Sequence, residues 1–245
     1  MTSLEIENER YKKVVKANAL IQKSRYELTA LQQKVVLYLI SKIEPYETEL
    51  KECQFNIADF CKVCGIDCDS GGNYAMLKRV IKELADKSIW ITLEDGSETL
   101  LRWIERPYIR KKSGIIKLKI DELMKPYLLQ QKKEYTSYEL IWALQLEKKY
   151  SLPLYELVKS IHYHELTIYE RIYDLEELRK IMGAENYKTW QHFKERALEP
   201  AIEEINKYTN KIIDYEVIKY GRVVGRIKLK VSTKDTYQAL KDKRV

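Results

Sequence analysis

One helical pattern occurs twice in this chain of 245 residues, and it constrains the fold more than any other feature. Residues 56–65 and 174–183 each begin with a cap-type residue, continue with apolar positions three and four apart, and end in glycine. Asn-Tyr follows each glycine, at 73–74 and 186–187, and opens a longer helical pattern with a basic face. Alternating apolar and polar residues around a glycine turn come after each long helix. This order predicts a winged helix, which places its second helix in a DNA groove.

Two copies of the pattern predict an α+β chain with two tandem winged-helix domains. An amphipathic helix starting at Leu28-Thr29 precedes the first copy, and one starting near Tyr150-Ser151 precedes the second, so each module has three helices. The polar stretch 130–134 is the expected linker. We therefore expect one domain over residues 12–130, a second over 134–232, and a flexible polar tail over 233–245.

Composition is consistent with two folded domains. The chain is 45% apolar and 33% charged, which supports hydrophobic cores and excludes a disordered or fibrous protein. Its net charge of +7 suits a polyanionic partner. The N-terminus lacks the apolar segment of a signal peptide, and the longest apolar run, 35–40, is too short to span a membrane. We expect a cytoplasmic protein with no membrane partner.

The first basic helix, expected over 73–88, carries candidate DNA contacts. Its core-facing positions leave Lys78, Arg79 and Lys82 toward solvent, where they can meet phosphates or guanine edges. A solvated surface helix is the alternative, because two neighbouring acidic residues dilute the charge.

The second basic helix, expected over 186–206, carries more candidate DNA contacts than the first. Its first three turns hold six polar residues outside the apolar stripe: Lys188, Gln191, His192, Lys194, Glu195 and Arg196. Lysine, arginine and glutamine read base edges well, and a glutamate can accept from a cytosine amine. We expect double-stranded DNA to contact this end, and a kink or break at Pro200.

The hairpins suggest further contacts. The tips carry basic residues, Arg110, Lys111 and Lys112 in the first hairpin and Arg222 in the second, and we expect them to contact DNA.

The first hairpin also has more apolar residues than a DNA-contacting wing needs. We expect Trp90, Leu101 and Trp103 to form a dimer interface, with a homodimer in equilibrium with the monomer. The alternative is that the segment around 123–128 folds back and covers this surface.

Catalytic and metal motifs are weak. Cys53, Cys61, Cys64 and Cys68 include a C-x2-C, half of a zinc site, but both thiols of that motif also serve as small apolar residues of a helix. His162-Tyr163-His164 resembles the metal motif of origin-nicking nucleases, yet it follows a helical stripe rather than lying on a central strand. The chain has no phosphate-binding glycine loop of an ATP motor. We expect no catalytic residue, no metal and no cofactor.

Several segments resemble bacterial plasmid replication initiators of the RepA/RepB/RepE type. Residues 14–21 and 26–34 are similar to the opening of these proteins. Residues 150–157 are similar to the start of their second module, and 193–206 to their recognition helix, including its proline. The resemblance covers about residues 12–232.

This resemblance implies two winged helices that bind directly repeated origin sequences, called iterons, and start plasmid replication. It also implies a monomer that is active at the origin, a dimer joined through the first domain that represses its own gene, and help from the host initiator, helicase and chaperones. A tandem winged-helix transcriptional regulator is the first alternative, and a metal-dependent origin-nicking enzyme is the second.

Overall fold

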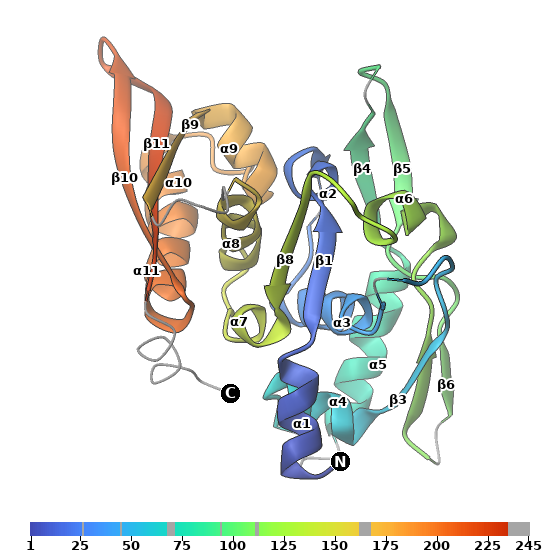
Figure 1. The fold of residues 1–245 in the computed structure, drawn as a ribbon. Helices are drawn as coiled ribbons and strands as arrows, with labels where there is room; N and C mark the ends of the chain where they lie inside the picture. Colours follow the sequence, from blue (N-terminus) through green and yellow to red (C-terminus); the bar gives the residue numbers. More distant parts are fainter. Residues whose placement is uncertain are drawn as a thin grey trace. The chain divides into compact units, whose positions relative to one another are not determined.

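The computed structural model describes residues 1–25, 27–44, 46–67, 72–93, 95–110, 113–161 and 168–234, apart from the side chains of Arg25 and Asn73. The chain forms two compact units, a first from Met1 to Leu144 and a second from Gln145 onward. Each unit mixes helices with antiparallel strands, which confirms the α+β class (Figure 1). None of the described helices has the length and apolarity needed to cross a membrane.

The elements of the first unit are α1 (Ser3–Arg10), β1 (Lys13–Ala17), α2 (Asn18–Gln22), β2 (Ser24–Arg25), α3 (Ala30–Ile40), β3 (Cys53–Asn56), α4 (Ile57–Cys64), α5 (Gly72–Ala85), β4 (Ser88–Thr92), β5 (Glu98–Arg102), β6 (Tyr108–Arg110), β7 (Ile115–Leu118), the 3₁₀ turn η1 (Glu122–Met124), α6 (Lys125–Leu128), β8 (Tyr135–Glu139) and α7 (Leu140–Leu144). Those of the second unit are α8 (Ser151–Ser160), β9 (Ile168–Asp174), α9 (Leu175–Met182), α10 (Trp190–Phe193), the π turn η2 (Lys194–Leu198), α11 (Glu199–Tyr208), β10 (Lys211–Tyr220) and β11 (Val223–Thr233).

One arrangement is repeated in the two units. A short strand leads directly into a helix, β3 into α4 and β9 into α9, and a longer helical segment follows. The chain then forms a hairpin whose second strand pairs with the first strand of the module. The resulting sheets have the equivalent orders β3-β7-β6 and β9-β11-β10. With α3 and α8 preceding them, these elements make a complete winged helix in each unit.

The turn after the first helix of each module has the same geometry. Gly65 has φ 63° and Gly183 has φ 65°, which is the left-handed region that favours glycine. The N–H of Ile66 donates to the carbonyl of Cys61 at 2.9 Å, and that of Ala184 to Arg179 at 2.8 Å. Both helices therefore end in the same hydrogen-bonded turn, and the glycines are required for its conformation.

The start of each of these helices is bonded to its hairpin. Asn56 Oδ1 accepts from the N–H of Ala58 at 2.8 Å, and Asn56 Nδ2 donates to the carbonyl of Ser113 at 3.2 Å. Asp174 Oδ1 accepts from Nε of Arg226, on β11, at 2.8 Å. A cap-type residue thus fixes the helix relative to the wing in both modules.

The division between the units differs from the expected linker at 130–134. Strand β8 pairs antiparallel with β1, with Val14 opposite Tyr138. Residues 134–144 therefore belong to the first unit, and the boundary lies between Leu144 and Gln145. The polar stretch 130–134 connects α6 to β8 within that unit. Its composition indicated a loop, but only the pairing of β8 shows which unit the loop serves.

The first unit has an additional hairpin, β4–β5, which lies with β2 in a sheet of its own. Its strands extend in the opposite direction from strands β6 and β7 (Figure 1). Of the three residues expected at a dimer interface, Leu101 is 4% exposed and Trp103 2%, whereas Trp90 is 50% exposed. The expected patch is therefore wrong for Leu101 and Trp103, because alternate side chains of a strand face opposite sides. Only Trp90 of the three lies at the surface.

A buried lysine, Lys211, lies at the start of β10 in the three-stranded sheet of the second unit. Lys211 is 2% exposed, donates to Oγ1 of Thr233 at 2.7 Å, and lies 5.6 Å from the ring centre of Tyr169. Burial, reinforced by the charge of Lys159, lowers the pKa of Lys211 to about 8. The charged form therefore destabilises the folded state at neutral pH.

We expect Lys211→Met to raise the free energy of unfolding at pH 7 by about 1–2 kcal/mol, after allowing for the lost hydrogen bond to Thr233. The pKa of Lys211 is about 8 in the folded state and about 10.5 in the unfolded state, so the unfolded chain binds more protons between these two pH values. The parent should therefore gain stability as pH rises from about 8 to about 10.5. Urea unfolding of parent and variant at pH 7 and pH 10 measures this difference. A difference in stability between variant and parent that is the same at both pH values would contradict the expectation.

Candidate nucleic-acid interface

The basic helix of the second unit begins later and continues further than expected. Thr189 caps it, with Oγ1 accepting from the N–H of His192 at 3.3 Å, so the helix starts at Trp190 and residues 186–188 lie in the preceding turn. It then runs without interruption through α10, η2 and α11 to Tyr208. The chain therefore stays helical through Pro200, and the expected break there is wrong.

The π turn explains why the helix tolerates this proline. In an α-helix the ring of Pro200 would clash with the carbonyl of the residue four positions earlier. Here the N–H of Glu199 donates to the carbonyl of Lys194, five positions earlier, so the turn is wider. The wider turn accommodates the proline without ending the helix.

The outer side of this helix contains the polar residues that the sequence indicated. Gln191, His192, Glu195 and Arg196 are exposed on the helix, and Lys188 is exposed in the turn before it. The Gln191 amide donates to the Glu195 carboxylate. Among the described residues, the side chains of Lys188, His192 and Arg196 form no hydrogen bond or ion pair, so these three are available to a ligand.

Lys194 is less exposed than the other polar residues at the start of this helix. It is half-buried, and its Nζ lies 3.5 Å from Oε1 of Glu199. The Tyr215 hydroxyl, on β10, donates to the same oxygen at 3.0 Å. Lys194 is therefore partly engaged within the protein and is less available to DNA than Arg196.

The inner side fixes the helix on its unit. Phe193 is fully buried, with the Arg179 guanidinium of α9 5.6 Å from its ring centre. The Trp190 ring lies 6.2 Å from that of Tyr215. Glu204 is also buried, and its carboxylate accepts from the N–H of Lys148 at 3.0 Å. Glu204 therefore joins the end of the helix to the start of the unit.

The equivalent helix of the first unit is α5. Its buried positions are Leu77, Val80, Ile81 and Leu84, as the 3–4 spacing predicted. Lys78, Arg79 and Lys82 are exposed. Arg79 lies 3.9 Å from Glu83, and Lys82 lies 3.1 Å from Asp86. Exposed pairs of this kind contribute little stability, so these cations can exchange partners for phosphates.

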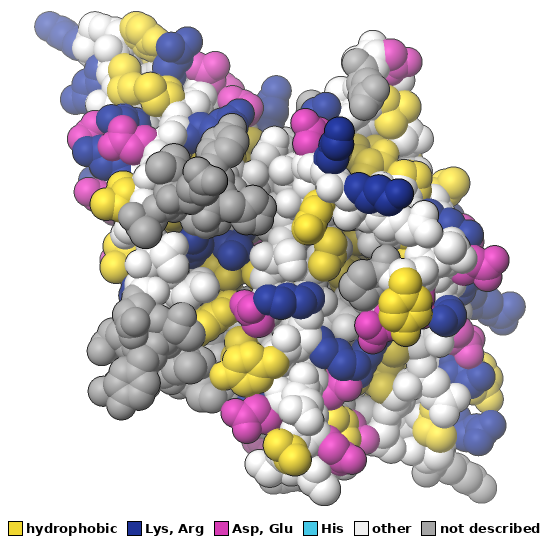
Figure 2. Space-filling model, in the orientation of Figure 1, with side chains coloured by type: hydrophobic (Ala, Val, Ile, Leu, Met, Phe, Trp, Pro, Cys, Tyr) yellow, Lys and Arg dark blue, Asp and Glu magenta, His cyan; other side chains and the backbone are white. Residues whose placement is uncertain are grey.

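The hairpin tips are basic to different degrees. Arg222 is exposed in the turn between β10 and β11, where Figure 2 shows Lys and Arg side chains at the end of the hairpin. Lys219 is also exposed there, and the sequence analysis did not predict it as a DNA contact. The signal that could have identified it is the pair of basic residues that flank Tyr220-Gly221. In the first unit Arg110 is exposed at the end of β6, and Lys111 and Lys112 lie outside the described residues.

The cysteines do not form a metal site within the described part of the chain. Cys53 and Cys64 are free thiols, and complete burial raises the pKa of Cys64 to about 12. No group of three or more His, Cys, Asp or Glu residues that could hold a metal ion occurs among the described residues. Cys68 and the His162-Tyr163-His164 motif fall outside them.

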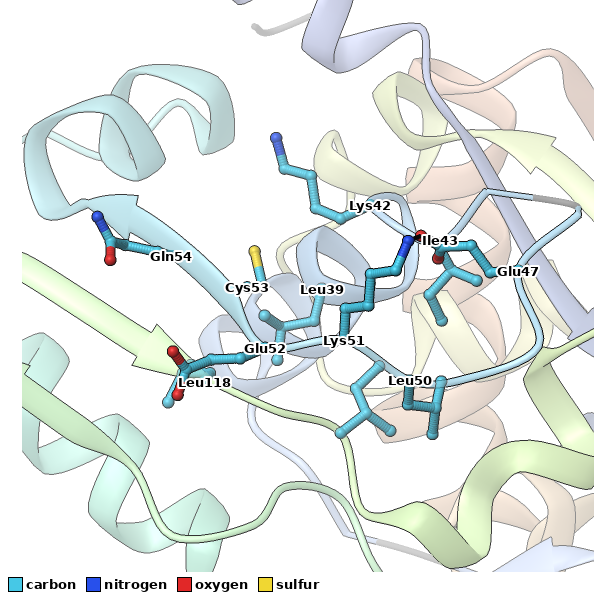
Figure 3. A pocket seen from close by; sticks show the side chains of 11 residues that line it. Leu39, Lys42, Ile43, Glu47, Leu50, Lys51, Glu52, Cys53, Gln54 and Leu118 are labelled. Carbon is cyan, nitrogen blue, oxygen red and sulfur yellow. Dashed lines mark hydrogen bonds and ion pairs between the residues drawn. The ribbon is translucent and has the colours of Figure 1, made fainter.

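Cys53 instead lines a pocket of about 270 Å³ between the end of α3, the loop before β3, and β7 (Figure 3). The charged side chains at its rim are engaged in ion pairs, Lys51 with Glu47 and Lys117 with Glu52. This pocket is separate from the exposed side of α5 and carries no DNA contact that the sequence predicted.

Two family models match the chain. Residues 13–159 match "Initiator Replication protein, WH1", and residues 174–231 match "Initiator Rep protein, WH2". No curated protein matches the sequence. Among solved structures, the crystal structure of Pi initiator protein in complex with iteron DNA has a TM-score of 0.74 at 21% identity, over 92% of this chain and 99% of that one. These findings confirm the tandem winged-helix fold.

Proposed function

Because this chain belongs to the family of initiator replication proteins, we propose that it starts plasmid replication by binding directly repeated origin sequences, or iterons. The observation that carries this proposal is the exposed side of the helix from Trp190 to Tyr208, where the side chains of Arg196 and His192 have no hydrogen bond or ion pair with any described residue. Iteron DNA is also what the Pi initiator protein binds in its crystal structure. A recognition helix contacts bases with residues near its N-terminus, and that is where these side chains lie.

The two units have different roles in this proposal. The second unit provides most of the base specificity, because its free polar side chains gather at the start of the helix. The first unit provides mainly phosphate contacts through Lys78, Arg79 and Lys82. Arg222 and Arg110, at the wings, add contacts to the DNA backbone.

The phosphate role predicts a change in salt dependence. The plot of log K against log salt has a negative slope, and Lys78→Ala should make it less steep by roughly 1. The preferred DNA sequence should remain unchanged. We choose Lys78 because Arg79 and Lys82 have acidic partners on their own helix, and Lys51→Ala, at the rim of the pocket in the same unit, is the charge-matched control. Fluorescence anisotropy over a series of salt concentrations measures the slope. An unchanged slope with an altered preferred site would show that Lys78 reads a base instead.

The protein acts without catalysis in this proposal. Binding energy and recruited host proteins open the origin: the host initiator, the helicase and chaperones, in the cytoplasm. A transcriptional regulator of the same fold is the alternative, and it would bind the same kind of repeats without supporting replication.

The first unit also carries the surface for a homodimer in equilibrium with the monomer, and the dimer represses the gene of the protein. Trp90 and Leu100 lie directly opposite each other on β4 and β5 and are 50% and 47% exposed. Strand β5 is at the edge of its sheet. An exposed apolar pair beside a free strand edge favours pairing with a second chain.

Footprinting on DNA that flanks the gene tests the proposed function. Regularly spaced repeats should be protected, and a plasmid carrying only that region should replicate when the protein is supplied in trans. Protection without replication would favour the transcriptional regulator. Cleavage of single-stranded origin DNA that depends on Mg²⁺ or Mn²⁺ would instead identify an origin-nicking enzyme.

A further inference from the structure

The buried residues of the long helix in the second unit follow an unusual spacing. Phe193, Ala197, Ala201 and Ile205 are all fully buried and lie four positions apart throughout. In a regular α-helix, residues four apart are rotated by about 40°, so three steps turn such a row by about 120°. A row of this kind cannot face one core along a straight α-helix.

The π turn removes most of this rotation. It places one additional residue in the turn over Lys194–Leu198, and one residue corresponds to about 100°. The row therefore remains on the core side both before and after the turn. In the regular α-helix that this turn replaces, residues 190–193 would be rotated by about 100° relative to α11, and so would the polar side chains that precede the turn.

Two features of the chain hold the π turn in place. The first is Pro200, which disfavours a regular α-helix because its ring would clash with the carbonyl four positions earlier. The second is the pair formed by Lys194 and Glu199. Side chains five positions apart do not face each other on an α-helix, where neighbours are three or four apart. Across the π turn they lie at 3.5 Å, and Tyr215 holds the Glu199 carboxylate from β10.

We propose that Pro200 and the Lys194–Glu199 pair lock this π turn, and that the turn sets the direction in which Gln191 and His192 face DNA. Pro200 is thus a specificity-determining residue that touches no base and acts through position. The inference rests on the proposed DNA-binding function and adds a residue that controls its selectivity.

The test is Pro200→Ala in the full chain, with Pro153→Ala as the matched control. Pro153 lies in the first turn of α8, in the same unit, where a missing N–H breaks no helical hydrogen bond. Pro200→Ala should reduce affinity for the protected repeats by about tenfold or more while changing affinity for unrelated DNA of equal length by less than about threefold. Its melting temperature should fall, because a regular α-helix would rotate the fully buried Phe193 away from the core, but circular dichroism should still show a folded protein. Pro153→Ala should keep the parent's preference.

A second measurement reads the turn directly. Through-hydrogen-bond NMR couplings identify the carbonyl that accepts from the Glu199 N–H, which is Lys194 in the parent and should become Glu195 in Pro200→Ala. A Glu199→Gln variant, which removes one charge of the pair, should shift both readouts in the same direction. A Pro200→Ala protein that keeps the parent's preference, or loses it with the Lys194 hydrogen bond intact, would overturn the proposal. A parent that prefers no repeat would overturn the proposed function instead, and the NMR couplings would still decide whether Pro200 locks the turn.

Discussion

Arg196→Ala is expected to cost about 1–3 kcal/mol of binding free energy on specific DNA, roughly a ten- to hundredfold loss of affinity. The guanidinium is exposed next to the start of the recognition helix and forms no ion pair among the described residues. Under the proposed function, it therefore contacts DNA without first breaking an ion pair with a described residue. Lys194→Ala should cost less than Arg196→Ala, because Lys194 is half-buried beside Glu199.

Competition binding with repeat DNA and unrelated DNA measures this loss. Lys180→Ala, an exposed charge-matched change on α9, should leave the preference for the repeats unchanged. If Arg196→Ala discriminates between the two DNAs as well as the parent does, this residue reads no base. If all six polar positions from Lys188 to Arg196 can be changed to alanine with specific binding intact, the helix is wrongly assigned.

Trp103→Ala is expected to lower the free energy of unfolding of the first unit by about 3–5 kcal/mol. Trp103 is the residue directly after β5, and it is only 2% exposed. Truncation therefore removes a large buried apolar group and leaves a cavity. Urea unfolding followed by tryptophan fluorescence and circular dichroism measures the change. A loss below about 1 kcal/mol would show that Trp103 is not a core residue.

Trp90→Glu is the matched control for the stability measurement, and it also tests whether the β4–β5 hairpin forms a dimer interface. Trp90→Glu changes a side chain that is 50% exposed, so the first unit should remain folded. If the β4–β5 hairpin joins two copies, this variant should sediment as a monomer at concentrations where the parent forms dimers. A variant that dimerises as readily as the parent would place the interface elsewhere.

Local patterns in the sequence predicted much of the fold. The cap residue, the 3–4 spacing and the terminal glycine of α4 and α9 are local signals, and both helices end at the expected glycines, Gly65 and Gly183. The exposed basic residues of α5 and the second recognition helix were identified for the same reason. The position of a side chain on a helix follows from its neighbours three and four positions away.

Contacts between distant segments could not be predicted in this way. Strand β9 was missed because its partner β11 is separated from it by an entire helix–turn–helix, and because only Tyr169 and Tyr173 of its residues are buried. The boundary at Leu144 depends on β8 pairing with β1, at the other end of the unit. Leu101 and Trp103 were assigned to the surface because composition alone does not show which face of a hairpin is covered.

The π turn had a signal that was interpreted incorrectly. The sequence predicted an apolar stripe along this helix and a kink or break at Pro200. A strict spacing of four beside a proline is better explained by one wider turn, since a break would leave no reason for the row to continue with the same period.

The pairing of β1 with β8 has a consequence for the order of events during synthesis. Lys13 and Glu139 are 126 positions apart, so the N-terminal strand leaves the ribosome long before its partner exists. At about 5–20 residues per second, this interval is roughly 6–25 s. During that time residues 13–17 lack the strand with which they pair, and Val14 and Ala17, which are buried in the folded unit, lack part of their cover; unpaired segments of this kind can associate between chains. Neighbouring polysomes therefore have a time window in which two unfinished copies can meet, and a slower ribosome lengthens it.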